Sequence, residues 1–66
     1  MFGKNLRELR NANELTRNAL AKKLGVSMQS IYDWEIGKHE TDFVTLIKIA
    51  DYFDVSIDEL LGRKEL

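Results

Sequence analysis

The sequence predicts an all-α fold made of five short helices. Proline is absent and glycine is sparse among the 66 residues, whereas Leu, Lys, Glu, Arg and Ala, which favour helices, are plentiful. Apolar side chains also recur at the three- and four-residue spacing of amphipathic helices. The chain has no Cys and a single His, so it cannot supply the ligands of a structural zinc site, and we expect neither a metal nor a cofactor.

An apolar stripe marks each of the first two helices. The polar stretch 11–14 ends the first helix, and Thr16 is the expected N-cap of the second, because its hydroxyl can accept a hydrogen bond from a free backbone N–H. Gly25 then stands where the end of a helix favours a left-handed residue. The two stripes consist of Phe2, Leu6 and Leu9, and of Leu20, Ala21 and Leu24.

The remaining three helices each begin at a capping residue. Ser27 is the expected N-cap of the third helix, which ends near Gly37, and Asp42 is that of the fourth. Ser56 and Glu59 form an S-x-x-E capping box that starts the fifth. The third helix turns Ile31 and Trp34 inward, and the fourth has the longest amphipathic pattern, formed by Phe43, Leu46, Ile47, Ile49, Ala50 and Phe53.

Charge is unevenly distributed along the chain, although its net value is −1. Residues 16–39 carry four basic and two acidic side chains, whereas residues 40–66 carry three basic and seven acidic ones. No apolar run approaches the ~20 residues of a membrane span, and nothing resembles a signal peptide. We therefore expect a cytoplasmic protein without a membrane partner. No carboxylate pair stands beside a nucleophile or metal ligand, so we do not expect an enzyme.

The connection between the second and third helices carries the functional signal. Only the residues 24–27 (Leu-Gly-Val-Ser) join them, and Gly25 permits a sharp reversal. Burial of the shared apolar face leaves the opposite side of the third helix exposed. Helix-turn-helix proteins place such an exposed helix in the major groove of DNA.

The sequence resembles the lambda repressor/Cro-like (Xre-type) helix-turn-helix family from Leu6 to Leu61. The resemblance implies a compact five-helix DNA-binding domain over residues 1–66, with the motif at 17–36 and a recognition helix at about 28–36. The matching pieces, in order, are Leu6-Arg7-x-x-Arg10, Leu15-Thr16, Leu20-Ala21-x-x-Leu24-Gly25-Val26-Ser27, Ile31-x-x-Trp34-Glu35-x-Gly37-Lys38, Leu46-x-x-Ile49-Ala50 and Val55-Ser56-Ile57-Asp58-Glu59-Leu60-Leu61.

The resemblance also implies roles for individual residues. Gln29 is the strongest base-reading candidate, because an amide can form two hydrogen bonds with adenine. An ion pair between Arg10 and Glu35 would tie the first helix to the end of the third. The implied base-contacting residues are Ser27, Met28, Gln29, Tyr32 and Asp33, and the implied phosphate-contacting residues are Arg17, Asn18, Lys38 and His39.

Three positions depart from the family pattern. Arg17 replaces a common Gln but still suits a phosphate, and Thr41 replaces the usual Pro before the fourth helix. Asp33 is the most consequential departure. Its carboxylate can accept a hydrogen bond from cytosine N4, but it otherwise repels nearby phosphates.

Together these features predict a sequence-specific transcriptional regulator of prokaryotic or phage type, more specifically a repressor. We expect a homodimer on a palindromic operator with half-sites ~34 Å apart. The expected dimer contact is the fifth helix and the tail, through Val55, Ile57, Leu61 and Leu66. Two alternatives stay open: a protein-interaction module, such as an antitoxin-like or adaptor partner, and the N-terminal DNA-binding domain of a longer repressor.

Overall fold

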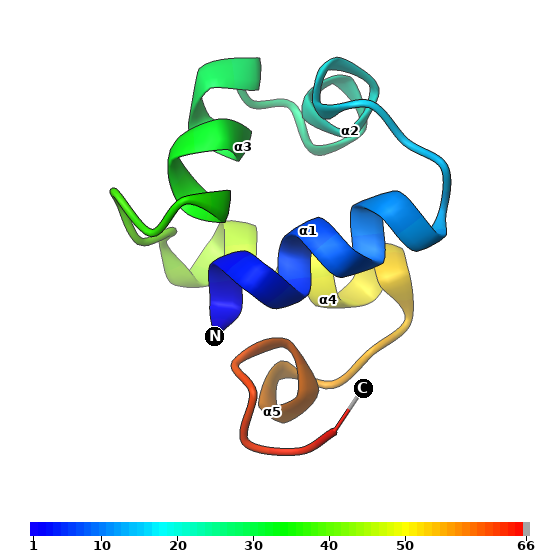
Figure 1. The fold of residues 1–66 in the computed structure, drawn as a ribbon, viewed down its shortest axis with the longest axis vertical. Helices are drawn as coiled ribbons and strands as arrows, with labels where there is room; N and C mark the ends of the chain where they lie inside the picture. Colours follow the sequence, from blue (N-terminus) through cyan, green and yellow to red (C-terminus); the bar gives the residue numbers. More distant parts are fainter. Residues whose placement is uncertain (66) are drawn as a thin grey trace.

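In a computed structural model, residues 1–65 are described and form five α-helices without a β-strand (Figure 1). The predicted all-α class is confirmed, and the described part measures 27 × 23 × 20 Å. None of the helices in residues 1–65 is both long and apolar enough to cross a membrane. The helices are α1 (Phe2–Ala12), α2 (Arg17–Leu24), α3 (Met28–Glu35), α4 (Phe43–Phe53) and α5 (Ile57–Leu60).

Four of the five helices begin at the predicted capping residue. In each case a side-chain oxygen accepts a hydrogen bond from the backbone N–H three residues later, which satisfies one of the free donors at the helix start. Glu59 also returns a bond to the backbone N–H of Ser56, so the predicted capping box is complete. The capping residues are Thr16, Ser27, Asp42 and Ser56.

The core draws apolar side chains from every helix. α2 packs against α3 and α4, while α1 packs against α3 and α5 (Figure 1). α3 therefore has its inner face covered by α1 and α2, and its outer face stays exposed. The fully or nearly buried apolar residues are Leu6, Leu20, Ala21, Leu24, Ile31, Trp34, Leu46, Ile49, Ala50 and Leu60.

The structure corrects one expectation about the C-terminal part of the chain. Val55 and Ile57 were expected to supply apolar surface beyond the needs of the core, but both are partly buried and pack against it. The physical reason is the shortness of α5, which is a single turn and buries only Leu60 completely. Ile57 at the start of α5 and Val55 before it therefore help to cover this end of the core.

Two contacts that fix α1 are not visible in the sequence. Gly3 lies directly against the C-terminal end of α3, where a Cβ atom would collide with the backbone carbonyl oxygens of Trp34 and Glu35. The side chain of Asn5 is buried, and its Nδ2 donates to the carbonyl oxygens of Glu59 (3.1 Å) and Leu60 (3.2 Å). α1 thus holds the end of α3 and the end of α5 in place.

Candidate nucleic-acid interface

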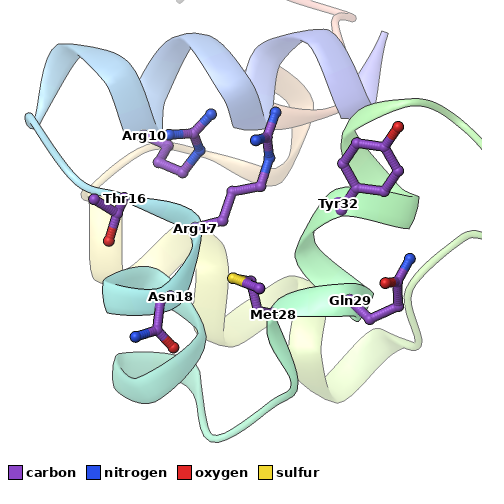
Figure 2. Close-up of a pocket in the computed structure, with 7 residues that line it drawn as sticks. All are labelled: Arg10, Thr16, Arg17, Asn18, Met28, Gln29 and Tyr32. Carbon is purple, nitrogen blue, oxygen red and sulfur yellow. The ribbon is translucent and has the colours of Figure 1, made fainter.

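A surface pocket opens between the N-terminus of α2 and the exposed face of α3 (Figure 2). The chain reverses between these helices at Gly25, whose φ of 72° is left-handed, as its position predicted. The pocket has a volume of about 580 Å³. Its lining consists of Arg10, Thr16, Arg17, Asn18, Met28, Gln29 and Tyr32. It brings together five of the nine residues that sequence reasoning assigned to DNA.

The α3 side chains at this pocket are open to solvent. Met28 is 53% exposed and Tyr32 43% exposed, and Gln29 is also exposed. In Figure 2 the sulfur of Met28 points toward α2, whereas the amide of Gln29 points away from it. An outward amide, a thioether and a phenol ring thus lie along one face of a short helix.

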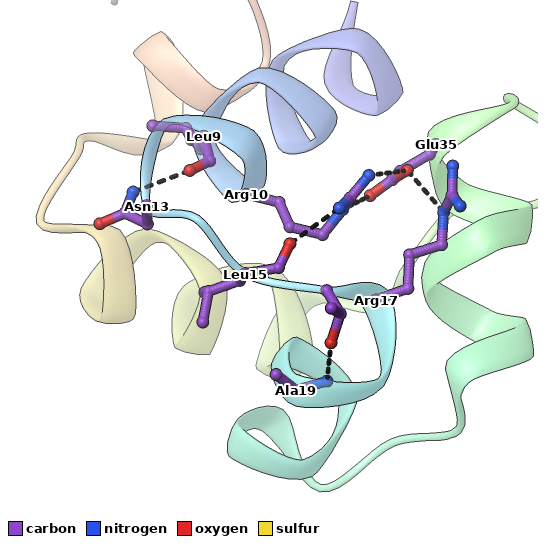
Figure 3. A network of polar contacts seen from close by, with 8 residues as sticks. Leu9, Arg10, Asn13, Leu15, Arg17, Ala19 and Glu35 are labelled. Carbon is purple, nitrogen blue, oxygen red and sulfur yellow. Dashed lines mark hydrogen bonds and ion pairs between the residues drawn. The ribbon is translucent and has the colours of Figure 1, made fainter.

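A buried carboxylate joins this face to the rest of the fold (Figure 3). Glu35 has a side chain only 1% exposed, and its Oε2 lies 2.7 Å from Nε of Arg10. Arg10 Nη2 donates to the other carboxylate oxygen at 3.2 Å, and Arg10 Nη1 donates to the carbonyl oxygen of Leu15 at 2.8 Å. One arginine of α1 therefore fixes both the end of α3 and the loop before α2.

Arg17 contributes to the same network, which the sequence did not indicate. Its Nε donates to Glu35 Oε1 at 3.0 Å, and its guanidinium lies 5.3 Å from the ring centroid of Tyr32. This placement combines an ion pair with a cation–π contact. Because the Arg17 side chain is 35% exposed, it borders the pocket while part of its charge is neutralised by Glu35.

Two further side chains of the predicted site hydrogen-bond within α3. Ser27 Oγ accepts from the backbone N–H of Ser30 at 3.1 Å, so its hydroxyl serves as the helix cap. Asp33 Oδ1 accepts from Nε2 of Gln29 at 2.9 Å. The spacing of four residues between Gln29 and Asp33 is the signal that could have revealed this pair, because such residues are neighbours on a helix surface.

The other predicted phosphate contacts are exposed to solvent. Asn18 is exposed on α2, and Lys38 and His39 are exposed in the loop after α3, outside the pocket. The backbone N–H of Lys38 donates to the carbonyl oxygen of Asp33 at 2.8 Å, which anchors the start of that loop to α3. Within residues 1–65, no group of three or more His, Cys, Asp or Glu side chains is placed to hold a metal ion.

A second exposed surface is apolar and lies mainly on α4. Phe43 is 83%, Val44 65% and Ile47 51% exposed, and Leu61 is 39% exposed beyond α5. A groove of about 290 Å³ lies between Phe43 and Leu61. Leu61 is therefore available at the surface, as expected, but its apolar neighbours belong to α4 rather than α5. The fourth residue of the expected dimer contact, Leu66, lies outside the described residues.

Comparison with known proteins identifies the family of this five-helix fold. A helix-turn-helix family model matches residues 6–60, which is most of the chain. The chain belongs to the Xre-type helix-turn-helix family. The uncharacterized HTH-type transcriptional regulator YqaE of Bacillus subtilis is 41% identical over 61 residues, which are 92% of this helix-turn-helix chain and 53% of the relative. The chain thus spans about half the length of that relative.

Two solved structures share the fold of this helix-turn-helix chain. The restriction-modification controller protein C.AhdI from Aeromonas hydrophila superposes with a TM-score of 0.81 at 34% identity, over 89% of each chain. The P22 c2 repressor protein, solved in complex with a synthetic operator, has a TM-score of 0.86 at 28% identity, over 91% of each chain. The predicted lambda repressor-like fold is confirmed.

Proposed function

We propose that this chain binds double-stranded DNA in a sequence-specific way and regulates transcription, with α3 as the recognition helix. The observation that carries the proposal is the exposed face of α3, where Met28, Gln29 and Tyr32 lie beside the N-terminus of α2. The major groove is about 12 Å wide and admits one α-helix. The P22 c2 repressor, a structural neighbour, was solved with an operator, which supports the same partner here.

The proposed roles follow the position of each side chain. Gln29 reads adenine through its amide, and the apolar atoms of Met28 and Tyr32 contact thymine methyl groups. Asn18 at the start of α2 and Lys38 after α3 contact phosphates, since helix N-termini and cations attract them. His39 and the Nη groups of Arg17 add to these phosphate contacts. Ser27 borders the same face through the first turn of α3, and Asp33 acts beside Gln29.

We further propose that two copies bind together on a palindromic operator and act as a repressor, because an occupied operator excludes the polymerase. Doubling the phosphate contacts strengthens binding by a chain whose net charge is −1. The apolar surface of Phe43, Val44, Ile47 and Leu61 supports a second copy as its occupant, since such patches mark interaction sites.

Charge on α4 favours the same occupant. Lys48 and Asp51 are exposed on the face that carries Val44 and Ile47, at helical spacing. An antiparallel pair of α4 helices can therefore place each lysine beside the aspartate of the other copy. This self-complementarity is what a two-fold contact between identical chains requires.

Selection of bound duplexes from a random DNA library tests the proposal. We expect an enriched palindrome with half-sites about one helical turn apart, and an affinity that falls steeply with salt. Gln29→Ala should weaken binding and relax the base preference. Lys38→Ala should weaken binding to all sequences alike and lower the salt slope by about one.

The matched control for Lys38→Ala is Lys22→Ala, which replaces a solvent-exposed lysine in the last turn of α2. It removes the same charge away from the proposed phosphate contacts, so its effect on the salt slope should be smaller. Absence of any enriched sequence would refute the proposal and favour the protein-interaction module. Equal effects of Gln29→Ala and Lys38→Ala on every sequence would refute the assigned roles.

A further inference from the structure

Asp33 is an unexpected residue on the face proposed to meet DNA. A carboxylate there repels phosphates. The contact of Asp33 with the following loop does not use the side chain, because the backbone carbonyl oxygen accepts from the backbone N–H of Lys38. The side chain is engaged by one neighbour. Nε2 of Gln29, one helical turn earlier, donates to Oδ1 of Asp33 at 2.9 Å.

We propose that Asp33 is a specificity-determining positioning residue that fixes the orientation of the Gln29 amide and so selects adenine over guanine. The inference rests on the proposed function, because it concerns the base that α3 meets in the major groove. Asp33 itself does not touch the base. It acts through Gln29, and this distinguishes it from the side chains assigned to direct contact.

The selection follows from the donors and acceptors involved. An ionised carboxylate only accepts hydrogen bonds, so it can hold the NH₂ group of the Gln29 amide but not its carbonyl oxygen. The amide then presents Oε1 together with its second N–H to the outside. Adenine offers the N6 donor and the N7 acceptor, which match this pair, whereas guanine offers the acceptors O6 and N7. A guanine O6 would face Oε1, with no proton between them.

Removing the carboxylate should free the amide to turn over. In Asp33→Asn the new side chain can accept from the NH₂ group of Gln29 or donate to its Oε1. In the second arrangement Gln29 presents its NH₂ group to the base, and a guanine can accept from it. Asp33→Ala removes the restraint entirely. Both variants also remove a negative charge that faces phosphates.

The experiment measures base preference separately from affinity. The half-site selected by the wild-type chain is changed from A·T to G·C at each position in turn, and binding of each duplex is titrated at constant salt. We expect one position where the wild-type chain prefers adenine by about fivefold or more, which is the lower end of the range for a good bidentate contact. Asp33→Asn and Asp33→Ala should reduce that preference several-fold while overall affinity stays equal or rises.

Two controls isolate the mechanism. Asp58→Asn makes the same charge change on α5, where the aspartate is exposed, and should leave the preference at that position unchanged. Gln29→Ala should abolish the preference, and adding Asp33→Asn to Gln29→Ala should change it no further. A merely structural Asp33 would lower the thermal stability of the fold without altering the ratio of the two affinities.

The outcomes separate this inference from the function on which it rests. If the wild-type chain selects no DNA sequence, the proposed function fails first. If a site is selected and Gln29→Ala abolishes the adenine preference, but Asp33→Asn retains it in full, the positioning role of Asp33 is overturned while DNA binding stands. A preference that survives Gln29→Ala would also overturn it, because the base would then be read by another residue.

Discussion

Replacing Arg10 by methionine should strongly destabilise this fold. Arg10 is the more buried of the two partners of Glu35, with a side chain 9% exposed, and it holds both carboxylate oxygens of Glu35. Methionine keeps most of the apolar volume but leaves Glu35 buried beside one remaining cation. Removing one member of a buried ion pair costs about 3–5 kcal/mol, and we expect the lower end because Arg17 stays in place.

The matched change Arg17→Met should cost much less. Its side chain is 35% exposed and makes one bond to Glu35, so solvent screens the interaction, and partly exposed pairs contribute about 1 kcal/mol or less. Arg7→Met, on the exposed part of α1, is the control for the substitution itself and should be close to neutral. The expected order of destabilisation is therefore Arg10, then Arg17, then Arg7.

Urea unfolding followed by the fluorescence of Trp34 and by far-UV circular dichroism measures these values. A chain of this size has a total unfolding free energy of roughly 3–10 kcal/mol, so a loss of about 3 kcal/mol removes about a third of it or more. An osmolyte added to all variants alike defines the folded baseline of Arg10→Met. The double variant Arg10→Met, Glu35→Leu should recover much of the loss, because it removes both buried charges. Equal losses for Arg10→Met and Arg17→Met, or no recovery in the double variant, would refute this reasoning.

Three further changes test other parts of the fold. Gly3→Ala should lower the unfolding free energy by about 1–3 kcal/mol, although alanine favours helices, because its methyl group collides with α3; thermal unfolding measures it. Thr41→Val should raise it by about 1 kcal/mol in the same assay, because Oγ1 of Thr41 is buried without a hydrogen-bond partner. Hydrogen bonds from Thr45 hold the pKa of Asp42 below its ordinary value of 3.8. The stability that the ionised Asp42 contributes is therefore fully present above pH 3.8 and is lost as the pH falls through the lowered pKa. Asp42→Asn keeps the cap without titrating, so its melting temperature should fall less between about pH 5 and pH 2 than that of the wild-type chain.

Most of the fold could be predicted because its signals act over a few residues. The caps at Thr16, Ser27, Asp42 and Ser56 each need only a hydroxyl or carboxylate three residues before a free N–H. The apolar stripes likewise repeat within single helices. The contacts of Gly3 and Asn5 could not be predicted in this way, because each depends on which remote backbone segment packs against α1.

The same distinction applies to the surfaces. Val55 and Ile57 were expected to supply apolar surface beyond the core, because the sequence does not show how little of the core a single-turn α5 covers. The sequence also did not show that the apolar face of α4 is exposed, and the reason is different. Phe43 and Ile47 belong to the amphipathic pattern of that helix, and the pattern alone treats every apolar member as core, although the structure leaves both more than half exposed.

The candidate site was predictable in its membership but not in its internal contacts. The sequence assigned Arg17 to a phosphate and treated Asp33 as a repulsive charge, and each was considered as a separate group facing DNA. In the structure each side chain has a partner inside the protein: Glu35 for Arg17, and Gln29 for Asp33. Glu35 offsets part of the charge of Arg17, so Arg17 attracts phosphates less than its formal charge suggests. The hydrogen bond from Gln29 leaves the charge of Asp33 in place but restricts the direction in which the Gln29 amide points. Glu35 also binds Arg10, so its ion pairs join α1, α2 and α3. These ion pairs fix the position of the exposed face of α3 that is proposed to contact the bases. Under the proposed function, stability and base recognition depend on the same buried carboxylate, and we expect a substitution at Glu35 to impair both together.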